Sequence, residues 1–223
     1  MKSCEIAENL HRLRHEIPEG VELVAVSKFQ TNEAIIAAYD AGQRVFGESR
    51  VQEFVAKYES LPNDIKWLFI GHLQTNKVKQ IIGKADLIAS VDTERLLELI
   101  DNVSAEKGIV SRVLLEVHVA QEETKYGFSP QEVLDYFIKR KFENLKSTHL
   151  CGLMGMATNT DDTERIRKDF GTLAKLYSEI KGMWADLRGF DILSMGMSDD
   201  FPIAIEEGAN MVRVGTAIFG SRK

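Results

Sequence analysis

Cysteine is scarce in this sequence, because only Cys4 and Cys151 occur among 223 residues, and they lie far apart. That spacing argues against a disulfide framework and is typical of a chain that works in the reducing cytoplasm. No run of about 18 apolar residues occurs, and residues 1–20 are polar and charged. We therefore expect neither a membrane span nor a signal peptide.

An excess of positive charge is also lacking, as are the spacings of metal ligands. The formal net charge is -6, and no basic stripe with interleaved aromatic residues occurs, so we expect no nucleic-acid partner. The five histidines follow none of the spacings that metal ligands require, so we expect no metal site.

The sequence does contain a regular alternation of short apolar runs and amphipathic segments. Eight runs are typical of buried strands, near residues 23–28, 44–47, 67–70, 87–89, 113–119, 149–154, 192–193 and 211–214. Continuous apolar strands that alternate with helices indicate a parallel sheet covered on both faces. Eight such units predict an α/β fold, a closed (β/α)8 TIM barrel, as a single domain over residues 1–223.

The segments around the strands refine this fold. An open, doubly wound sheet is the alternative, but no G-x-G-x-x-G motif follows the first strand. No long helical segment follows the eighth strand, so we expect an extra N-terminal helix over residues 3–16 to cover that gap. Capping boxes at residues 49–52 and 129–132 predict two helix starts, and another helix is expected over residues 75–83.

Lys28 ends the first apolar run, whose sequence is VAVSK. Desolvating an ammonium group is expensive, so a strand buried on both faces should not end in lysine without a reason. One interpretation is that Lys28 only marks the exit of the strand into solvent. The other is that Lys28 lies where the carboxyl ends of the strands meet, which is the active face of such barrels.

Two loops that contain glycine follow the seventh and eighth strands, where such barrels often bind phosphate. They are SMGMS at residues 194–198 and GT at residues 215–216. Glycine lets the backbone approach an anion, hydroxyls can donate to it, and Ser198 is placed to cap the next short helix. Each loop alone is also compatible with an ordinary turn, but the two together predict a phosphate site.

The eighth strand lies beside the first in a closed barrel, so the phosphate site and Lys28 should be neighbours. A phosphate beside a desolvated lysine fits two chemistries: a lysine imine with a sugar phosphate, as in an aldolase, or with pyridoxal 5′-phosphate. Arg213, near the end of the eighth strand, could face the pyridine nitrogen of that cofactor and keep it unprotonated. It could equally clamp the phosphate of either ligand.

Six motifs in order resemble one known family. They are AVSK at 25–28, FGESRVQE at 46–53, IGHLQTNK at 70–77, GLM at 152–154, SMGMSDD at 194–200 and VRVGTAIFG at 212–220. From about Leu23 to Gly220 the chain resembles the pyridoxal phosphate homeostasis proteins, the single-domain relatives of bacterial alanine racemase. The resemblance implies the barrel of the alanine racemase N-terminal domain.

The resemblance also implies pyridoxal 5′-phosphate as cofactor, with Lys28 as the lysine that forms the imine. It implies cofactor contacts from Ser194, Ser198, Arg213, Gly215 and Thr216. Further neighbours of the cofactor are then expected at Ser49, Ile70, His72, Met154 and Met195. The chain departs from the family's pattern at Ser49, where a longer asparagine is usual, and at Phe29, where a polar residue is usual.

Three residues keep alternative interpretations. His72 could stack on the cofactor ring or be a loop histidine that hydrogen-bonds to the backbone. Glu48 could lie at the mouth of the barrel or pair with Arg50. Lys125 could handle a second cofactor molecule or belong to a solvated, charged loop.

The resemblance favours a carrier or regulator over an enzyme. Racemisation at Cα needs acid–base groups on both faces of the carbanion, and alanine racemases take one of them from a separate β-domain. The sequence carries no such domain after the barrel, so we expect no catalytic residues and a monomer that passes the cofactor to apo-enzymes. The alternatives are a weak amino-acid racemase or lyase and a lysine-imine aldolase.

Overall fold

The computed structural model describes residues 3–122, 126–184 and 187–220. The elements are α1 (Ser3–Glu16), β1 (Glu22–Val26), α2 (Asn32–Asp40), β2 (Val45–Glu48), α3 (Val51–Ser60), β3 (Lys66–Phe69), η1 (Thr75–Lys77), α4 (Val78–Ile81), β4 (Leu87–Val91), α5 (Glu94–Lys107), β5 (Ser111–Val117), α6 (Pro130–Ile138), η2 (Lys141–Asn144), β6 (Thr148–Gly155), α7 (Thr163–Met183), β7 (Ile192–Ser194), α8 (Phe201–Glu206), β8 (Met211–Val214) and α9 (Thr216–Phe219).

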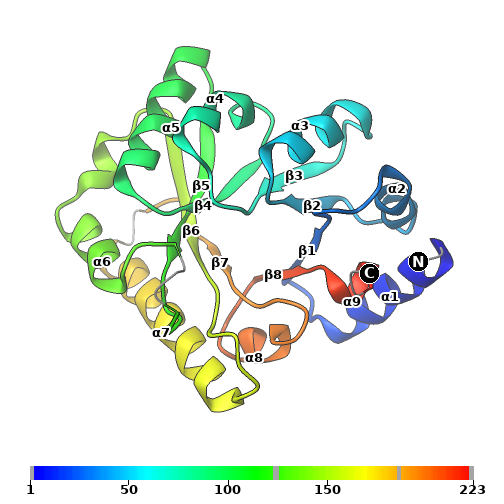
Figure 1. Cartoon of the computed structure of the whole chain (residues 1–223). Helices are drawn as coiled ribbons and strands as arrows, with labels where there is room; N and C mark the ends of the chain where they lie inside the picture. Colours follow the sequence, from blue (N-terminus) through cyan, green and yellow to red (C-terminus); the bar gives the residue numbers. More distant parts are fainter. Residues whose placement is uncertain (1–2, 123–125, 185–186, 221–223) are drawn as a thin grey trace.

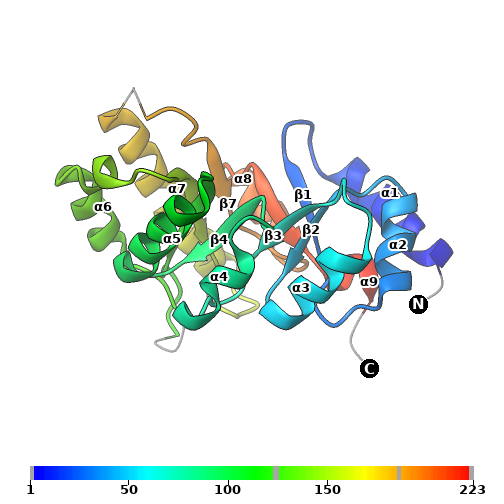
Figure 2. The ribbon, with the colours of Figure 1, turned by 90° about the horizontal axis from the view of Figure 1, so that it is seen from above.

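The eight strands form a closed parallel barrel, which confirms the predicted fold. Each strand pairs with the next along the chain, and β8 closes the ring by pairing with β1. The register at this closure places Val24 beside Arg213. The helices lie outside the strands (Figures 1 and 2). Because all the strands are parallel, their carboxyl ends meet at one end of the barrel.

Alternation along the strands decides which side chains fill the barrel. The interior cluster consists of Val24, Val45, Leu68, Leu87, Ala89, Leu114, Cys151, Met154 and Met211. Strand residues of the opposite parity join the larger cluster between the strands and the helices. Since side chains alternate with a period of two, Glu116 follows Leu114 on the inner face, and Arg213 follows Met211.

The N-terminal helix covers the gap left by the short α9, as the sequence predicts. Helix α1 packs against both α2 and α9, and the three lie together in Figure 1. Its buried face carries Ile6, Leu10 and Leu13, and Asn9 Nδ2 donates to the Ile218 carbonyl at 3.1 Å. This apolar face and the side-chain hydrogen bond dock the helix where no longer helix follows β8.

One of the two predicted capping boxes is present, and the other is not. Helix α6 has the predicted capping box: Glu132 N donates to Ser129 Oγ at 3.2 Å, and Ser129 N donates to Glu132 Oε2 at 2.7 Å. The other capping box is wrong, because α3 begins at Val51 behind Arg50, which makes no side-chain cap hydrogen bond. The helix predicted over residues 75–83 is also shorter than expected, because a 3₁₀ turn precedes the single turn of α4.

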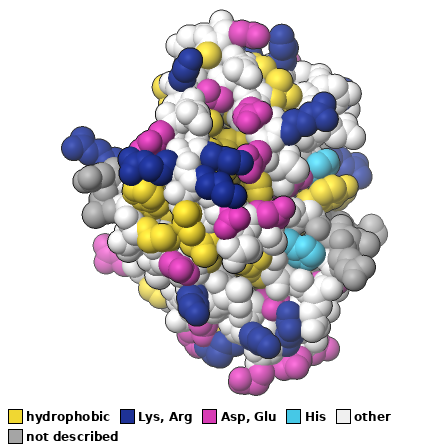
Figure 3. All heavy atoms as spheres, turned by 90° about the vertical axis from the view of Figure 1, so that its left-hand side faces the viewer, with side chains coloured by type: hydrophobic (Ala, Val, Ile, Leu, Met, Phe, Trp, Pro, Cys, Tyr) yellow, Lys and Arg dark blue, Asp and Glu magenta, His cyan; other side chains and the backbone are white. Residues whose placement is uncertain are grey.

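The surface on the side of α5–α7 has mixed charge. In Figure 3, basic and acidic side chains are interspersed over this face, and neither sign covers it continuously. Within the described ranges, we find no helix with the length and apolar character that a membrane crossing requires.

Candidate functional site

One cavity at the carboxyl end of the barrel brings most of the predicted site residues together. Its volume is about 250 Å³. The predicted residues that line it are Lys28, Ser49, Ile70, Ser198, Arg213, Gly215 and Thr216. The remaining lining comes from Val26, Gln30, Met156, Met197, Asp199 and Gly220, none of which was predicted to contact the cofactor.

Lys28 reaches the cavity from a tight turn after β1. Gln30 N donates to the Ser27 carbonyl at 2.9 Å and closes this four-residue turn. Phe29, inside the turn, has a φ of 66°, in the left-handed region that a bulky residue rarely adopts. Lys28 is half-buried, so its side chain lies at the boundary between the cavity and solvent.

Arg213 brings a fixed positive charge to the same cavity. Its Nη1 donates to Ser194 Oγ at 2.7 Å, and its Nη2 donates to the Gly155 carbonyl at 2.9 Å. Burial lowers the pKa of Arg213 to about 10, while Glu116 and Asp200 act in the opposite direction. The guanidinium therefore keeps its charge at neutral pH and is held in one orientation.

Ser198 links the two predicted phosphate loops. The amides of Gly215 and Ala217 donate to Ser198 Oγ at 3.2 and 3.3 Å. Ser198 does not cap the next helix as predicted, because α8 begins at Phe201 behind Asp200. A hydroxyl oxygen thus occupies a position where two backbone N–H groups converge, which is the environment that a phosphate oxygen favours.

Four predicted neighbours of the cofactor do not line the cavity: His72, described below, and three residues that lie deeper in the barrel wall. Ser194 is fully buried, and its Oγ accepts the hydrogen bond from Arg213 Nη1. Met195 follows it in the chain, so its side chain faces the other way and lies in the core between the strands and the helices. Met154 packs inside the barrel, in the interior cluster.

His72 pairs with protein groups at the β3–β4 side of the barrel mouth. Its Nδ1 lies 2.6 Å from Asp92 Oδ2, and its ring stacks on Tyr126 with centroids 3.9 Å apart. The register of β4 and β5 brings Asp92, one residue past the Val91–Leu115 pair, beside Glu116. The alternative of a loop histidine held by the backbone is therefore wrong, since its partner is a carboxylate.

Glu116 is a buried carboxyl that the sequence did not single out. It is 5% exposed, and its carboxyl group makes no hydrogen bond to a described residue, whereas its backbone carbonyl accepts one from Phe128 N at 2.8 Å. Burial, with a smaller contribution from Asp92, raises the pKa of Glu116 to about 7, while Arg213 and His72 act in the opposite direction. Only its place in an apolar strand run could have drawn attention to it.

Glu48 neither stays at the barrel mouth nor pairs with Arg50. It is fully buried and forms a 2.7 Å ion pair with Lys57, while Arg50 pairs with Glu53 at 3.6 Å. The i, i+4 spacing of Glu53 and Lys57 could have indicated a helical ion pair, but not its burial. Lys125 lies outside the described residues, and its role stays a prediction.

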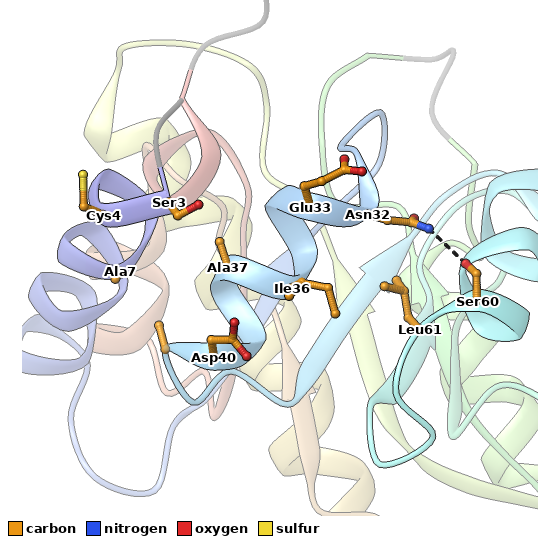
Figure 4. Close-up of a pocket in the computed structure, with 11 residues that line it drawn as sticks. Ser3, Cys4, Ala7, Asn32, Glu33, Ile36, Ala37, Asp40, Ser60 and Leu61 are labelled. Carbon is orange, nitrogen blue, oxygen red and sulfur yellow. Dashed lines mark hydrogen bonds between the residues drawn. The ribbon is translucent and has the colours of Figure 1, made fainter.

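A larger hollow, of about 640 Å³, lies outside the barrel between α1, α2 and the end of α3 (Figure 4). Small and apolar side chains line it, together with two acidic residues, Glu33 and Asp40. The described residues of its lining include neither a lysine nor an arginine. It therefore suits a phosphorylated ligand less well than the cavity of the barrel, although it is larger.

The chain matches the family model described as the alanine racemase N-terminal domain over residues 2–223. The pyridoxal phosphate homeostasis protein of Aquifex aeolicus is 39% identical to it, and the match covers 100% of both chains. The homeostasis protein of Haemophilus influenzae is 37% identical, over 91% of this chain and 85% of that protein.

Solved structures give the same result. PipY of Synechococcus elongatus, solved without pyridoxal phosphate, is 36% identical, with a TM-score of 0.91 over 96% of this chain and 100% of that chain. PipY with pyridoxal phosphate bound gives a TM-score of 0.87. Alanine racemase from E. faecalis, at 22% identity and a TM-score of 0.75, covers 100% of this chain and 59% of that chain and shares the fold. The chain therefore belongs to the pyridoxal phosphate homeostasis protein family, whose barrel is that of the alanine racemase N-terminal domain.

Proposed function

We propose that this protein holds pyridoxal 5′-phosphate as an imine on Lys28 and acts as a carrier in the homeostasis of that cofactor. One observation carries the proposal: Lys28, Arg213 and both predicted phosphate loops line a single cavity. The names of the relatives, and a PipY structure with the cofactor bound, support it.

The cavity fits the phosphate end of the cofactor. The hydroxyls of Ser198 and Thr216 and the amide of Gly215 can donate to a dianion. Ser198 Oγ already accepts a hydrogen bond from the Gly215 amide, which indicates that an acceptor fits there. These donors lie on the β7 and β8 side of the cavity, next to Lys28, because β8 pairs with β1.

The cavity also fits the aldehyde and the ring. When bound, the cofactor supplies an aldehyde that condenses with a primary amine. Lys28 Nζ provides that amine at the cavity wall. Arg213 is anchored by Ser194 and Gly155 and would present its guanidinium to the ring nitrogen. Because a guanidinium does not give up its proton at neutral pH, it would keep that nitrogen unprotonated.

The cavity favours a carrier over a racemase. Among the described residues that line it, Lys28 and Asp199 are the ionisable side chains besides Arg213. Two-sided proton transfer at Cα needs a positioned acid–base group on each face, so amino-acid turnover is expected to be slow. We include in the proposal a monomer that acts in the cytoplasm, supported by two free cysteines, and apo-enzymes as recipients.

Borohydride reduction tests the proposal directly. The purified protein loaded with cofactor should absorb in the visible range, and reduction should fix one cofactor per chain on the peptide that contains Lys28. Lys28→Arg keeps the charge but cannot form the imine, so it should lose the reducible adduct. An adduct of unchanged yield on another lysine would refute the assignment, and an aldolase would instead show no visible absorbance.

A further inference from the structure

The backbone on both sides of Lys28 is held by side chains of helix α3. Lys57 Nζ donates to the Ser27 carbonyl at 2.8 Å. On the other side, Phe29 N donates to Glu53 Oε2 at 2.8 Å. Because one residue separates these two anchors, they restrain both peptide groups that flank the Lys28 Cα.

The turn that carries Lys28 needs such restraint. Phe29 has a φ of 66°, which costs a bulky residue free energy and persists only where the surroundings enforce it. Two side chains at the start of α3 contact this residue: Glu53 of the helix accepts its N–H, and the guanidinium of Arg50, the residue before the helix, lies 4.3 Å from its ring centroid. The strain and its supports thus lie directly beside the lysine.

Lys57 belongs to a buried ionic network. It is 6% exposed and contacts Glu48 Oε1 at 2.7 Å and Glu53 Oε2 at 3.3 Å. Ser27 Oγ donates to the same Glu48 oxygen at 2.6 Å. Burial raises the pKa of Glu48, and its hydrogen bonds with Lys57 and Ser27 act in the opposite direction. Lys57 therefore ties β2, α3 and the Lys28 turn into one unit.

We propose that Lys57, with Glu48 and Glu53, is a positioning residue that sets the direction in which Lys28 meets the aldehyde of the cofactor. This inference rests on the proposed function. In the step concerned, the neutral Lys28 nitrogen bonds to the aldehyde carbon, the carbonyl oxygen leaves as water with the two hydrogens of the amine, and a C=N double bond remains. Lys57 takes no part in that exchange of atoms and acts through the backbone of the turn.

The network should affect the covalent linkage and leave non-covalent binding unchanged. The phosphate donors lie on the loops after β7 and β8, whereas the network lies between β1, β2 and α3. If the backbone at Lys28 is no longer held in one conformation, imine formation must fix that conformation itself. The entropic cost of fixing one residue lowers the equilibrium constant for imine formation by about tenfold. That loss should appear only for ligands that can form the imine.

The experiment compares two ligands on Lys57→Met. Pyridoxal 5′-phosphate reports imine formation plus non-covalent binding, and pyridoxine 5′-phosphate, an alcohol, reports non-covalent binding alone. The aldehyde should bind about tenfold more weakly than to the wild type, with reduced visible absorbance, and the alcohol should bind within about twofold. Lys57→Arg keeps the charge and can still donate, so it should restore most of the imine.

A matched control is a lysine that pairs with the same helix from the segment after α4. Lys84 forms a 2.7 Å ion pair with Glu59 on α3, away from the turn, so Lys84→Met should change neither affinity. If Lys57→Met does not fold, Glu53→Leu, which removes the acceptor of the Phe29 amide, should give the same split between the ligands. Glu53→Gln retains an acceptor and should lie nearer the wild type.

Equal losses for both ligands, or no loss for either, would overturn the positioning role. A wild type without a reducible linkage to Lys28 would instead overturn the proposed function, and the positioning role with it. The two failures are distinguishable by the wild type. It forms a normal imine if only the positioning role fails, and it forms no imine if the proposed function fails.

Discussion

Glu116 places a carboxyl inside the barrel, where it meets little water. The groups that face it are Asp92 from the end of β4, His72 from the loop after β3 and Arg213 from β8. Desolvation is the largest cause of its raised pKa, because no hydrogen bond from a described residue offsets the burial. The barrel therefore holds a group that changes charge near neutral pH beside the arginine of the candidate site.

This environment predicts how stability depends on pH. Between the ordinary pKa of 4.5 and the folded value of about 7, the folded protein keeps a proton that the unfolded chain has lost. The free energy of unfolding should therefore fall as the pH rises through this window. At about 1.4 kcal/mol per pH unit, the contribution of Glu116 is about 3 kcal/mol.

Glu116→Gln removes this titration. Urea unfolding of wild type and variant between pH 4.5 and 8 should show the variant gaining stability relative to the wild type by about 3 kcal/mol as the pH rises. Glu106→Gln, at an exposed carboxylate paired with Lys79, serves as the matched control and should follow the wild type across the range. A constant difference between wild type and Glu116→Gln would contradict the buried-carboxyl interpretation.

At the scale of elements, the loops after β7 and β8 act as one unit. Ser198, from the first loop, accepts hydrogen bonds from the amides of Gly215 and Ala217 in the second. The first loop supplies the hydroxyl oxygen, and the second supplies the two N–H groups that converge on it. The proposed phosphate site therefore depends on the pairing of β7 with β8, which brings the loops together.

Removing one donor from this unit should weaken retention of the cofactor. Thr216→Val and Ser198→Ala each remove a hydroxyl that can donate to a dianion, and each should weaken binding by about 1.5–3 kcal/mol. Equilibrium dialysis with pyridoxal 5′-phosphate measures the effect, and unchanged circular dichroism controls for the fold. Pyridoxal, which lacks the phosphate, should bind poorly to the wild type and equally to both variants. Equal affinity of the wild type for pyridoxal and for its phosphate would contradict a phosphate site in these two loops.

Local signals in the sequence predict elements better than they predict the partners of side chains. Apolar runs and helical periodicity give the eight-stranded barrel, because each depends on neighbours along the chain. Ser129 caps α6 as predicted, yet Ser49 does not cap α3 despite the same motif, because that helix begins at Val51, one residue later than the motif predicts. Lys28 could be predicted from its place at the end of a buried strand.

The residues that escaped prediction depend on contacts between distant segments. Lys57 reads as a surface lysine of an amphipathic helix, and only the fold buries it against Ser27, 30 residues away. Glu116 belongs to the strand parity that faces the barrel interior, which alternation cannot assign because Leu114 and Leu115, of opposite parity, are both apolar and buried. Met195 was expected near the cofactor because it belongs to the SMGMSDD motif, but it lies in the core. Membership of a motif does not indicate which face of the strand a side chain takes.

At the scale of the whole molecule, the barrel places the lysine proposed to form the imine at an accessible position. The cavity is built from strand ends on both sides of the β1–β8 closure, and Lys28 is half-buried within it. An amine from solvent, or from another protein, could therefore reach the proposed linkage at Lys28. This arrangement suits a carrier, because release requires exchange of the amine and no further chemistry at Cα.

The final prediction is that the loaded protein transfers its cofactor without consuming a substrate. Incubation with an apo-enzyme that requires pyridoxal 5′-phosphate should restore the activity of that enzyme, and a filtrate of the loaded protein, which contains only free cofactor, should restore less. Binding the cofactor does not by itself accelerate a reaction, since rate enhancement needs groups that act on the transition state. Free L-amino acids in deuterated solvent should therefore show only slow exchange of the Cα proton. Exchange or racemisation over many turnovers at roughly 1–10³ per second, the range of ordinary enzymes, would contradict the carrier proposal and indicate a racemase.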